Sequence, residues 1–302
     1  MSILAKFVEY SKNPTIETDY VIKNKVWEIL KLISFLSVVS LFCSVIGDFV
    51  ISYTLYDINS NLLNKIISNE LTWMVFLGFC LEAPFSEELQ FRLLLKPTFR
   101  NLLVSLWLGL SGFLYISILN SVGWNTLLGP IFTFLTLLII LYRIFSSNKR
   151  NQNSVVPQKY YKYLYYFSIF YFAFVHFNNY ADNSIWFLLP ILVLPQFIAG
   201  FSYSFIRMHF GIGWSILTHA LENFVVIFPI LICKEAASSI YESIKNSKQI
   251  IPDLVYTLPQ NNQILYFFGV GVGSAFLLFG LFMSVLGIKK YLQYKKSQSY
   301  VQ

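Results

Sequence analysis

Charged side chains are scarce in this sequence. Only 12% of the 302 residues are Asp, Glu, Lys or Arg, whereas 56% are hydrophobic and the mean hydropathy is +0.59. Soluble domains carry about 25% charged residues, so the composition excludes an ordinary soluble domain. It predicts an all-α polytopic membrane protein. The net charge of +7 does not indicate a nucleic-acid partner, because the basic residues lie in short clusters between apolar segments.

Cysteine is also scarce, and no cleavable signal peptide is visible. The chain has three cysteines, each in an apolar run and none in a CxxC or Cys/His pair. We therefore expect Cys43, Cys80 and Cys233 to pack as small hydrophobic side chains. Residues 1–26 mix charged residues with isolated apolar ones, so the first long apolar run is expected to insert and to remain in the membrane.

Apolar stretches of about 20 residues, the length that crosses a bilayer, recur along the whole chain. They predict a single transmembrane domain over residues 1–302, a bundle of about eight transmembrane helices. The expected spans are 27–50, 72–95, 101–120, 126–145, 160–178, 184–206, 212–233 and 263–287. The longest connections are 51–71 and 234–262, and we expect the second to be a surface loop.

The distribution of lysine and arginine predicts the orientation of these spans. When alternate connections are assigned to opposite sides, one side holds 17 basic residues and the other holds four, with Lys31 inside a helix. The minority side has only Lys65, Lys234, Lys245 and Lys248. Cytoplasmic loops carry the excess of basic residues, so both termini are expected in the cytoplasm.

A few ionisable side chains interrupt the apolar spans. Placing a charge at the bilayer centre costs about 2.5–3.5 kcal/mol on insertion scales, so such residues are functional candidates. They are Glu82, Glu87, Glu88, His176, His219 and Glu222.

The first group lies in "APFSEELQFR", residues 83–92. Glu88 and Arg92 are four residues apart, the helical spacing at which a carboxylate meets a guanidinium. Glu87 is rotated by about 100° from Glu88 around the helix, so it is less well placed to pair with Arg92. An unpaired carboxyl in an apolar setting tends to have a raised pKa, which a general base working near neutrality requires. Pro84 is expected to kink the helix or to begin a new segment, and to free backbone carbonyl groups nearby.

Two further groups contain histidine. His176 ends "FAFVH", where an interfacial or packing role is the alternative to catalysis. In "HALEN", His219 and Asn223 share a helix face and could also form an interhelical hydrogen-bond anchor. Glu222 points to a neighbouring face, and His209 in "RMHFG" is assigned no role.

Together these segments resemble a known family. "EELQFR" is similar to the EExxxR motif, "FAFVH" to the FxxxH motif and "HALEN" to the HxxxN motif of the CAAX prenyl protease and bacteriocin-processing family of glutamic intramembrane endopeptidases. The motifs occur in the family's order, and the resemblance covers about residues 72–228. The segments 101–120 and 126–145 lie between the first two motifs as an apparent inserted hairpin.

The resemblance implies hydrolysis of a peptide bond inside the membrane by a glutamate-activated water. Glu87 would be the general base, and His176 would hold or activate the water. His219 and Asn223 would stabilise the tetrahedral oxyanion, while Glu88 and Arg92 would support the site. No cofactor is implied; the alternative is a zinc protease in which Glu87, His176 and His219 bind the metal.

Straight helices would place Glu87 toward the cytoplasmic face and His176 toward the opposite face, at about 1.5 Å per residue. Either the helix is broken at Pro84, or the His176 helix is displaced inward, or the residues do not come together.

Two other classes of function stay open. One is a non-catalytic bacteriocin-immunity or partner-binding protein, and the other, ranked below it, is a transporter or channel. The richness in Phe, Tyr, Asn, Lys and Ile favours a low-GC bacterial source, hence the bacterial cytoplasmic membrane. The expected partners are the lipid bilayer and a leader-bearing peptide, a pheromone precursor or a membrane-protein terminus, rather than a prenylated protein.

Overall fold

The computed structural model describes residues 2–16, 24–52, 72–122, 138, 154–179, 187–246 and 260–299. Within these ranges every regular element is a helix and there is no strand, which confirms the all-α prediction for the described part of the chain. The predicted span 126–145, apart from Leu138, and the connection from 53 to 71 lie outside the described residues.

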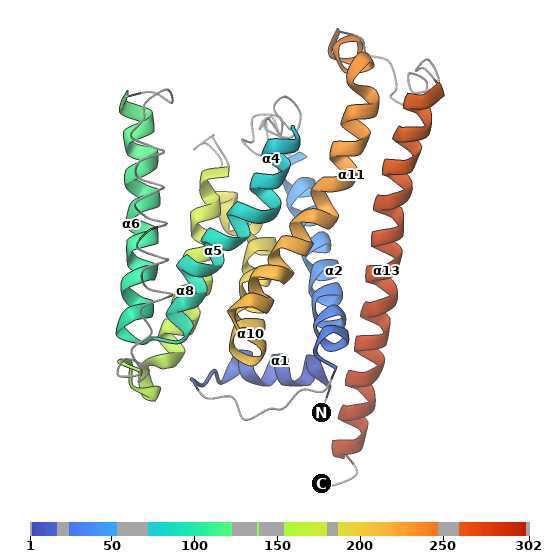
Figure 1. The fold of residues 1–302 in the computed structure, drawn as a ribbon. Helices are drawn as coiled ribbons and strands as arrows, with labels where there is room; N and C mark the ends of the chain where they lie inside the picture. Colours follow the sequence, from blue (N-terminus) through green and yellow to red (C-terminus); the bar gives the residue numbers. More distant parts are fainter. Residues whose placement is uncertain are drawn as a thin grey trace.

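Three of the described helices are long and apolar enough to cross a membrane. They are α2 (Lys25–Ser52), α11 (Ile212–Asn246) and α13 (Gln260–Ser299), over the stretches Lys25–Gly47, Ile212–Ala236 and Gln260–Gln298. Helices α2 and α11 both pack against α13, which runs antiparallel to them (Figure 1). Helix α6 (Phe99–Val122) stands at the other edge, and its apolar part covers Phe99–Leu110.

The segment that carries the paired glutamates is a helix with a local irregularity. It consists of α4 (Trp73–Leu77), a π-helical turn η3 (Gly78–Glu82), α5 (Ala83–Arg92) and a 3-10 turn η4 (Leu93–Leu95). The irregularity expected at Pro84 is therefore a π turn that ends just before it. Pro84 sits in the first turn of α5, where its missing N–H disturbs the helix least.

Two expected elements differ from the structure. The span 184–206 is two helices, α9 (Leu189–Leu192) and α10 (Leu194–Phe210), because a proline opens each of them at its first turn. The expected loop 234–262 is wrong from 234 to 246, since α11 continues through Pro229 to Asn246. The span 160–178 corresponds to α8 (Gln158–Val175) and the 3-10 turn η6 (His176–Asn179).

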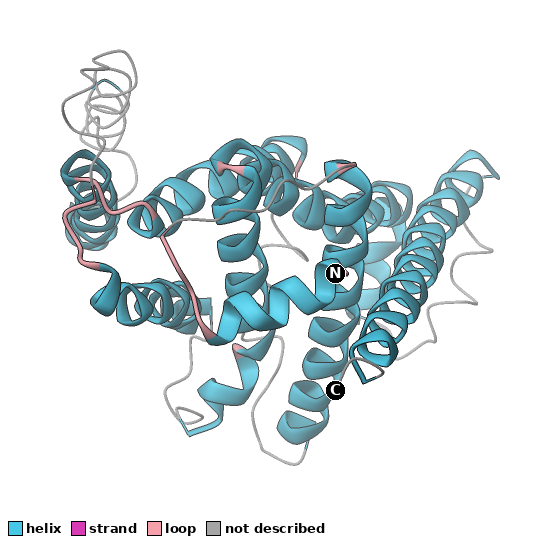
Figure 2. Ribbon diagram, turned by 90° about the horizontal axis from the view of Figure 1, so that it is seen from below, coloured by secondary structure: helices cyan, strands magenta, loops and turns pink. Residues whose placement is uncertain are grey.

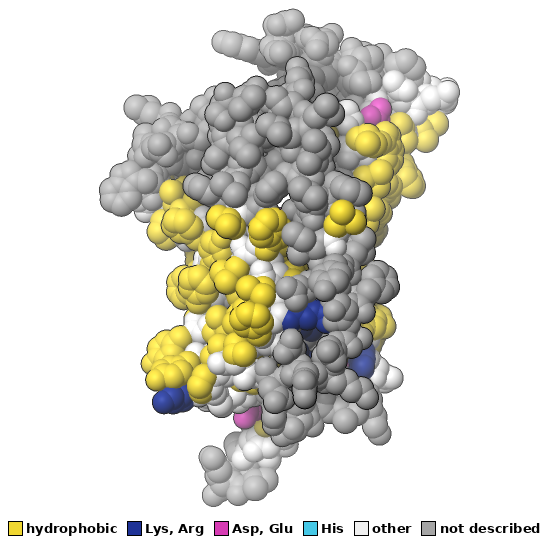
Figure 3. Space-filling model, turned by 60° about the vertical axis from the view of Figure 1, so that its left-hand side comes forward, with side chains coloured by type: hydrophobic (Ala, Val, Ile, Leu, Met, Phe, Trp, Pro, Cys, Tyr) yellow, Lys and Arg dark blue, Asp and Glu magenta, His cyan; other side chains and the backbone are white. Residues whose placement is uncertain are grey.

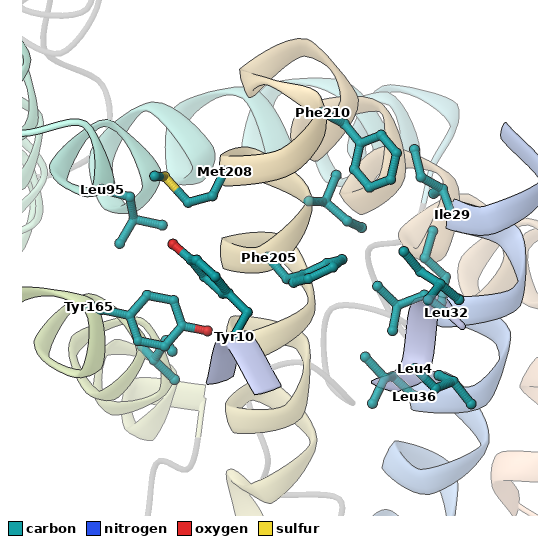
Figure 4. Packing of buried hydrophobic residues seen from close by; sticks show 14 of the residues in the cluster. Leu4, Tyr10, Ile29, Leu32, Leu36, Leu95, Tyr165, Phe205, Met208 and Phe210 are labelled. Carbon is teal, nitrogen blue, oxygen red and sulfur yellow. The ribbon is translucent and has the colours of Figure 1, made fainter. Parts of the chain in front are cut away.

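A short helix precedes the bundle. In α1 (Ile3–Lys12) the Ser2 hydroxyl accepts from the Ala5 N–H at 3.2 Å and caps the first turn. The helix lies across the lower ends of the other helices in Figure 1, and Figure 2 shows it crossing beneath them. Its Tyr10 ring packs edge-on against Tyr165 and Phe205, 5.6 and 5.9 Å between centroids, in the main buried cluster (Figure 4).

Large apolar side chains remain exposed on the outside of the helices. Phe42 and Phe49 on α2, Met74 on α4 and Leu106 on α6 are all at least 61% exposed. Figure 3 shows hydrophobic side chains over much of the described part of one face. A membrane provides the apolar surroundings that such a surface requires. The described part of the chain is thus a helical protein with the surface of a membrane protein.

Candidate active site

Four elements bring the motif residues together. Helix α5 carries Glu87 and Glu88, and α11 carries His219 and Asn223. His176 lies where α8 passes into η6. Helix α5 packs against both α8 and α11, and α10 packs against all three. Residues from widely separated parts of the sequence therefore share one region between the helices.

Glu88 and Arg92 form the expected pair inside α5. The Arg92 Nε lies 3.6 Å from Glu88 Oε2, and both side chains are fully buried. The guanidinium also lies over the Phe172 ring, 4.5 Å from its centroid, and its Nη1 is 3.4 Å from the Ser168 hydroxyl. A buried charge is tolerated only with a partner of this kind. The pair therefore fixes α5 against α8.

Glu88 also holds His219. The His219 Nδ1 lies 3.2 Å from Glu88 Oε1, and the Ser215 hydroxyl donates to Glu88 Oε2. The imidazole ring of His219 stacks on the Tyr203 ring, with the ring centroids 4.5 Å apart and an angle of 20° between the ring planes. With its Nδ1 toward Glu88, the ring turns its Nε2 toward Glu87. A carboxylate that accepts from one imidazole nitrogen sets the tautomer and orientation of the ring.

Glu87 lies between the two imidazoles. Its Oε2 is 3.9 Å from the Nε2 of His176 and 3.8 Å from the Nε2 of His219. This oxygen is buried and has no hydrogen-bond partner within the described residues, although 27% of the side chain is exposed. Both distances are too long for a direct hydrogen bond and allow a bridging water. The carboxylate and two imidazoles thus converge on one small space.

The His176 ring is oriented by its own helix. Its Nδ1 lies 2.7 Å from the Phe172 carbonyl oxygen, one turn earlier, so Nδ1 donates. In a neutral ring this leaves Nε2 as an acceptor that faces Glu87. Because the His176 side chain folds back along α8, it reaches toward Glu87 and offsets part of the difference in membrane depth that straight helices would give these two residues. Of the three arrangements left open by the sequence, the one in which these residues stay apart is wrong.

Asn223 has a different neighbour from the one expected. Its Nδ2 donates to the Phe79 carbonyl oxygen at 2.8 Å. In the π turn the Ala83 N–H bonds to the Gly78 carbonyl, so the next donor in the series would be residue 84. Pro84 has no N–H, which frees the Phe79 carbonyl for Asn223. Among the described residues, no side-chain hydrogen bond joins Asn223 to Glu87 or to the two histidines.

Sequence reasoning missed several members of this region. Tyr203 supports His219 and donates its hydroxyl to Glu222 Oε2. Glu222 also accepts from the Ser37 hydroxyl at 2.6 Å, so its carboxyl ties α11 to α10 and α2. Serine and tyrosine are common in apolar helices, and nothing in the sequence marked Tyr203 or Ser37. Only Glu222 carried a signal, as an ionisable residue in a span.

Glu87, His176 and His219, the ligands of the zinc alternative, are the same three residues that meet here. Zinc bonds nitrogen and oxygen ligands at about 2.0–2.2 Å, which holds tetrahedral ligand atoms about 3.4 Å apart. The atoms around Glu87 Oε2 are 3.8 and 3.9 Å away. No group of three His, Cys, Asp or Glu side chains with the geometry to hold a metal ion occurs in the described ranges.

Comparison with family models, curated protein sequences and solved structures finds no match to this chain.

Proposed function

We propose that this protein is an intramembrane endopeptidase of the glutamic type, in which Glu87 activates a water molecule for attack on a peptide carbonyl. The observation that carries the proposal is the buried Glu87 Oε2, which has no hydrogen-bond partner in the described part of the chain and faces two imidazole Nε2 atoms at 3.8 and 3.9 Å. The similarity of the three motifs to the CAAX protease and bacteriocin-processing family supports the same function.

In the proposed reaction, Glu87 and His176 hold the water. The water donates one hydrogen to Glu87 Oε2 and the other to His176 Nε2, which leaves an oxygen lone pair free for attack. As the carbon–oxygen bond forms, Glu87 takes the proton and later delivers it to the leaving amine. The peptide C–N bond breaks in that step, and the carboxylate of Glu87 is regenerated.

His219 would stabilise the oxyanion. To donate from Nε2 its ring must carry both protons, and Glu88, 3.2 Å from Nδ1, supplies the counter-charge. Arg92 in turn balances Glu88. Asn223 already uses one N–H on the Phe79 carbonyl, so we assign it to holding the π turn in place and not to the oxyanion.

The proposed setting is the cytoplasmic membrane of a bacterium, crossed by about eight helices with both termini in the cytoplasm. The bias of 17 basic residues against four supports this orientation. Helix α1 and the C-terminal end of α13 also lie at the same end of the molecule in Figure 1. The substrate would be a membrane-associated peptide or the terminus of a membrane protein.

The test is turnover of a quenched-fluorescent peptide library by purified protein in nanodiscs. We compare the wild type with Glu87→Gln and with Glu82→Gln, which makes the same chemical change at an exposed position one and a half turns earlier. The proposal predicts turnover by the wild type and Glu82→Gln, loss of turnover in Glu87→Gln, and no effect of a chelator.

Other results would favour the alternatives. Turnover abolished by a chelator and restored by zinc would replace the water mechanism with a metal-dependent one. Absence of turnover in a folded wild type would favour the partner-binding or immunity function, especially if Glu87→Gln still protects cells as the wild type does.

A further inference from the structure

A second arginine is buried at the end of the bundle where α10 finishes. Arg207 is 7% exposed, and its Nε donates to the Arg92 carbonyl oxygen at 3.3 Å. That carbonyl is available because the chain tightens into η4 after Arg92, where the Lys96 N–H bonds to Leu93. Arg207 therefore lies beside the C-terminal end of α5.

Most of the hydrogen-bonding capacity of Arg207 is unused. A guanidinium has five N–H donors, and only the one on Nε has a partner among the described residues. None of the ion pairs among the described residues includes Arg207. Glu88 is the carboxylate whose negative charge acts on Arg207, and it is already held by Arg92, Ser215 and His219. Burying a cation without a paired anion costs several kcal/mol.

A second cation lies nearby, because Lys96 caps η4 and η4 packs against α10, the helix that carries Arg207. Lys96 follows η4, has an exposed side chain, and makes no ion pair within the described ranges. Partial burial, and then the positive charge of Arg207, lower the pKa of Lys96. Two like charges that repel each other are stabilised by an anion between them. A planar guanidinium beside an ammonium suits the oxygen atoms of a phosphate group.

The position of the pair indicates where the phosphate comes from. Lys96 directly follows the predicted span 72–95, and Arg207 directly follows the predicted span 184–206. Both thus lie at the boundary between the bilayer and the cytoplasm, the level of lipid headgroups. Basic pockets between helices at this level attract anionic lipids.

We propose that Arg207 and Lys96 form a phosphate-binding site that holds the headgroup phosphate of an anionic phospholipid from the cytoplasmic leaflet. The site is separate from the proposed catalytic residues, and its occupancy does not depend on peptide hydrolysis. It would anchor the junction of α5 and α10 to the leaflet and compensate the charge of Arg207.

The test is native mass spectrometry of delipidated protein titrated with phosphatidylglycerol or, as a control, phosphatidylcholine. Lys96→Gln should weaken phosphatidylglycerol binding about fivefold, since a basic residue near the surface contributes about 1 kcal/mol. Arg207→Gln should weaken it about tenfold or more, the loss of a charged hydrogen bond. Lys12→Gln removes an exposed charge at the same end of the molecule and should leave the affinity unchanged.

Competition with inorganic phosphate distinguishes the two sources of the anion. If millimolar phosphate displaces the lipid from the wild type, the site recognises phosphate in either form; if it does not, the lipid is the specific ligand. Equal affinity in the wild type and Lys96→Gln, or an equal loss in Lys12→Gln, would overturn the proposal. Because Lys96 is exposed, its substitution remains informative even if Arg207→Gln does not fold.

Discussion

The contact between Asn223 and the Phe79 carbonyl makes a quantitative prediction about stability. The carbonyl loses its backbone donor because residue 84 is proline, and the Asn223 amide replaces that donor at 2.8 Å. Asn223→Ala leaves the carbonyl without a partner in an apolar setting. The expected loss is about 1–3 kcal/mol in the free energy of unfolding, the cost of an unsatisfied buried polar group.

A double-mutant cycle with Pro84→Ala tests the cause of this loss. Alanine at position 84 supplies a backbone N–H that can reach the Phe79 carbonyl, so Asn223→Ala should cost much less in that background. The coupling should be about 0.5–3 kcal/mol, as found for residues that share a partner. The free energies are measured by reversible unfolding in SDS, followed by circular dichroism. Equal costs of Asn223→Ala in the two backgrounds would refute the reasoning.

Three further predictions concern other parts of the structure. Glu88→Ala should lower stability by about 3–5 kcal/mol, because it leaves Arg92 buried without its partner; an unchanged unfolding curve would contradict this. Gly211 has a φ of +103°, so Gly211→Ala should destabilise by more than about 1 kcal/mol, whereas Gly213→Ala, with open space around it, should not. Burial lowers the pKa of His209 to about 4. In the unfolded protein the same imidazole has its ordinary pKa of about 6.5, so as the pH falls the unfolded state binds a proton before the folded state does. The free energy of unfolding should therefore decrease between pH 6.5 and 4, and it should decrease less steeply in His209→Gln.

Part of the fold and of the candidate site follows from local sequence. The pairing of Glu88 with Arg92 depends only on a spacing of four residues in one helix. The structure places Arg92 Nε 3.6 Å from Glu88 Oε2. The irregularity near Pro84 follows from the missing N–H. The helical class follows from composition and the lengths of the apolar runs.

Other features depend on contacts between distant residues. The sequence indicated that Asn223 is a polar residue within a span, but its acceptor, Phe79, is 144 residues away. The roles of Tyr203 and Ser215 beside His219 depend on the packing of α10 on α11, which no local pattern encodes. Residues 234–246 read as a polar connection, yet they continue α11 because helix end signals are absent there.

The proposed role of Glu87 is tested most directly by the hydrolysis rate for one cleaved peptide in nanodiscs. Once the library has supplied that peptide, kcat is compared between Glu87→Gln and Glu82→Gln. Loss of the general base should lower kcat by about 10²–10⁴, while Glu82→Gln should stay within about twofold of the wild type. Equal rates in the two variants, with both proteins folded, would contradict the assignment of Glu87 as the base.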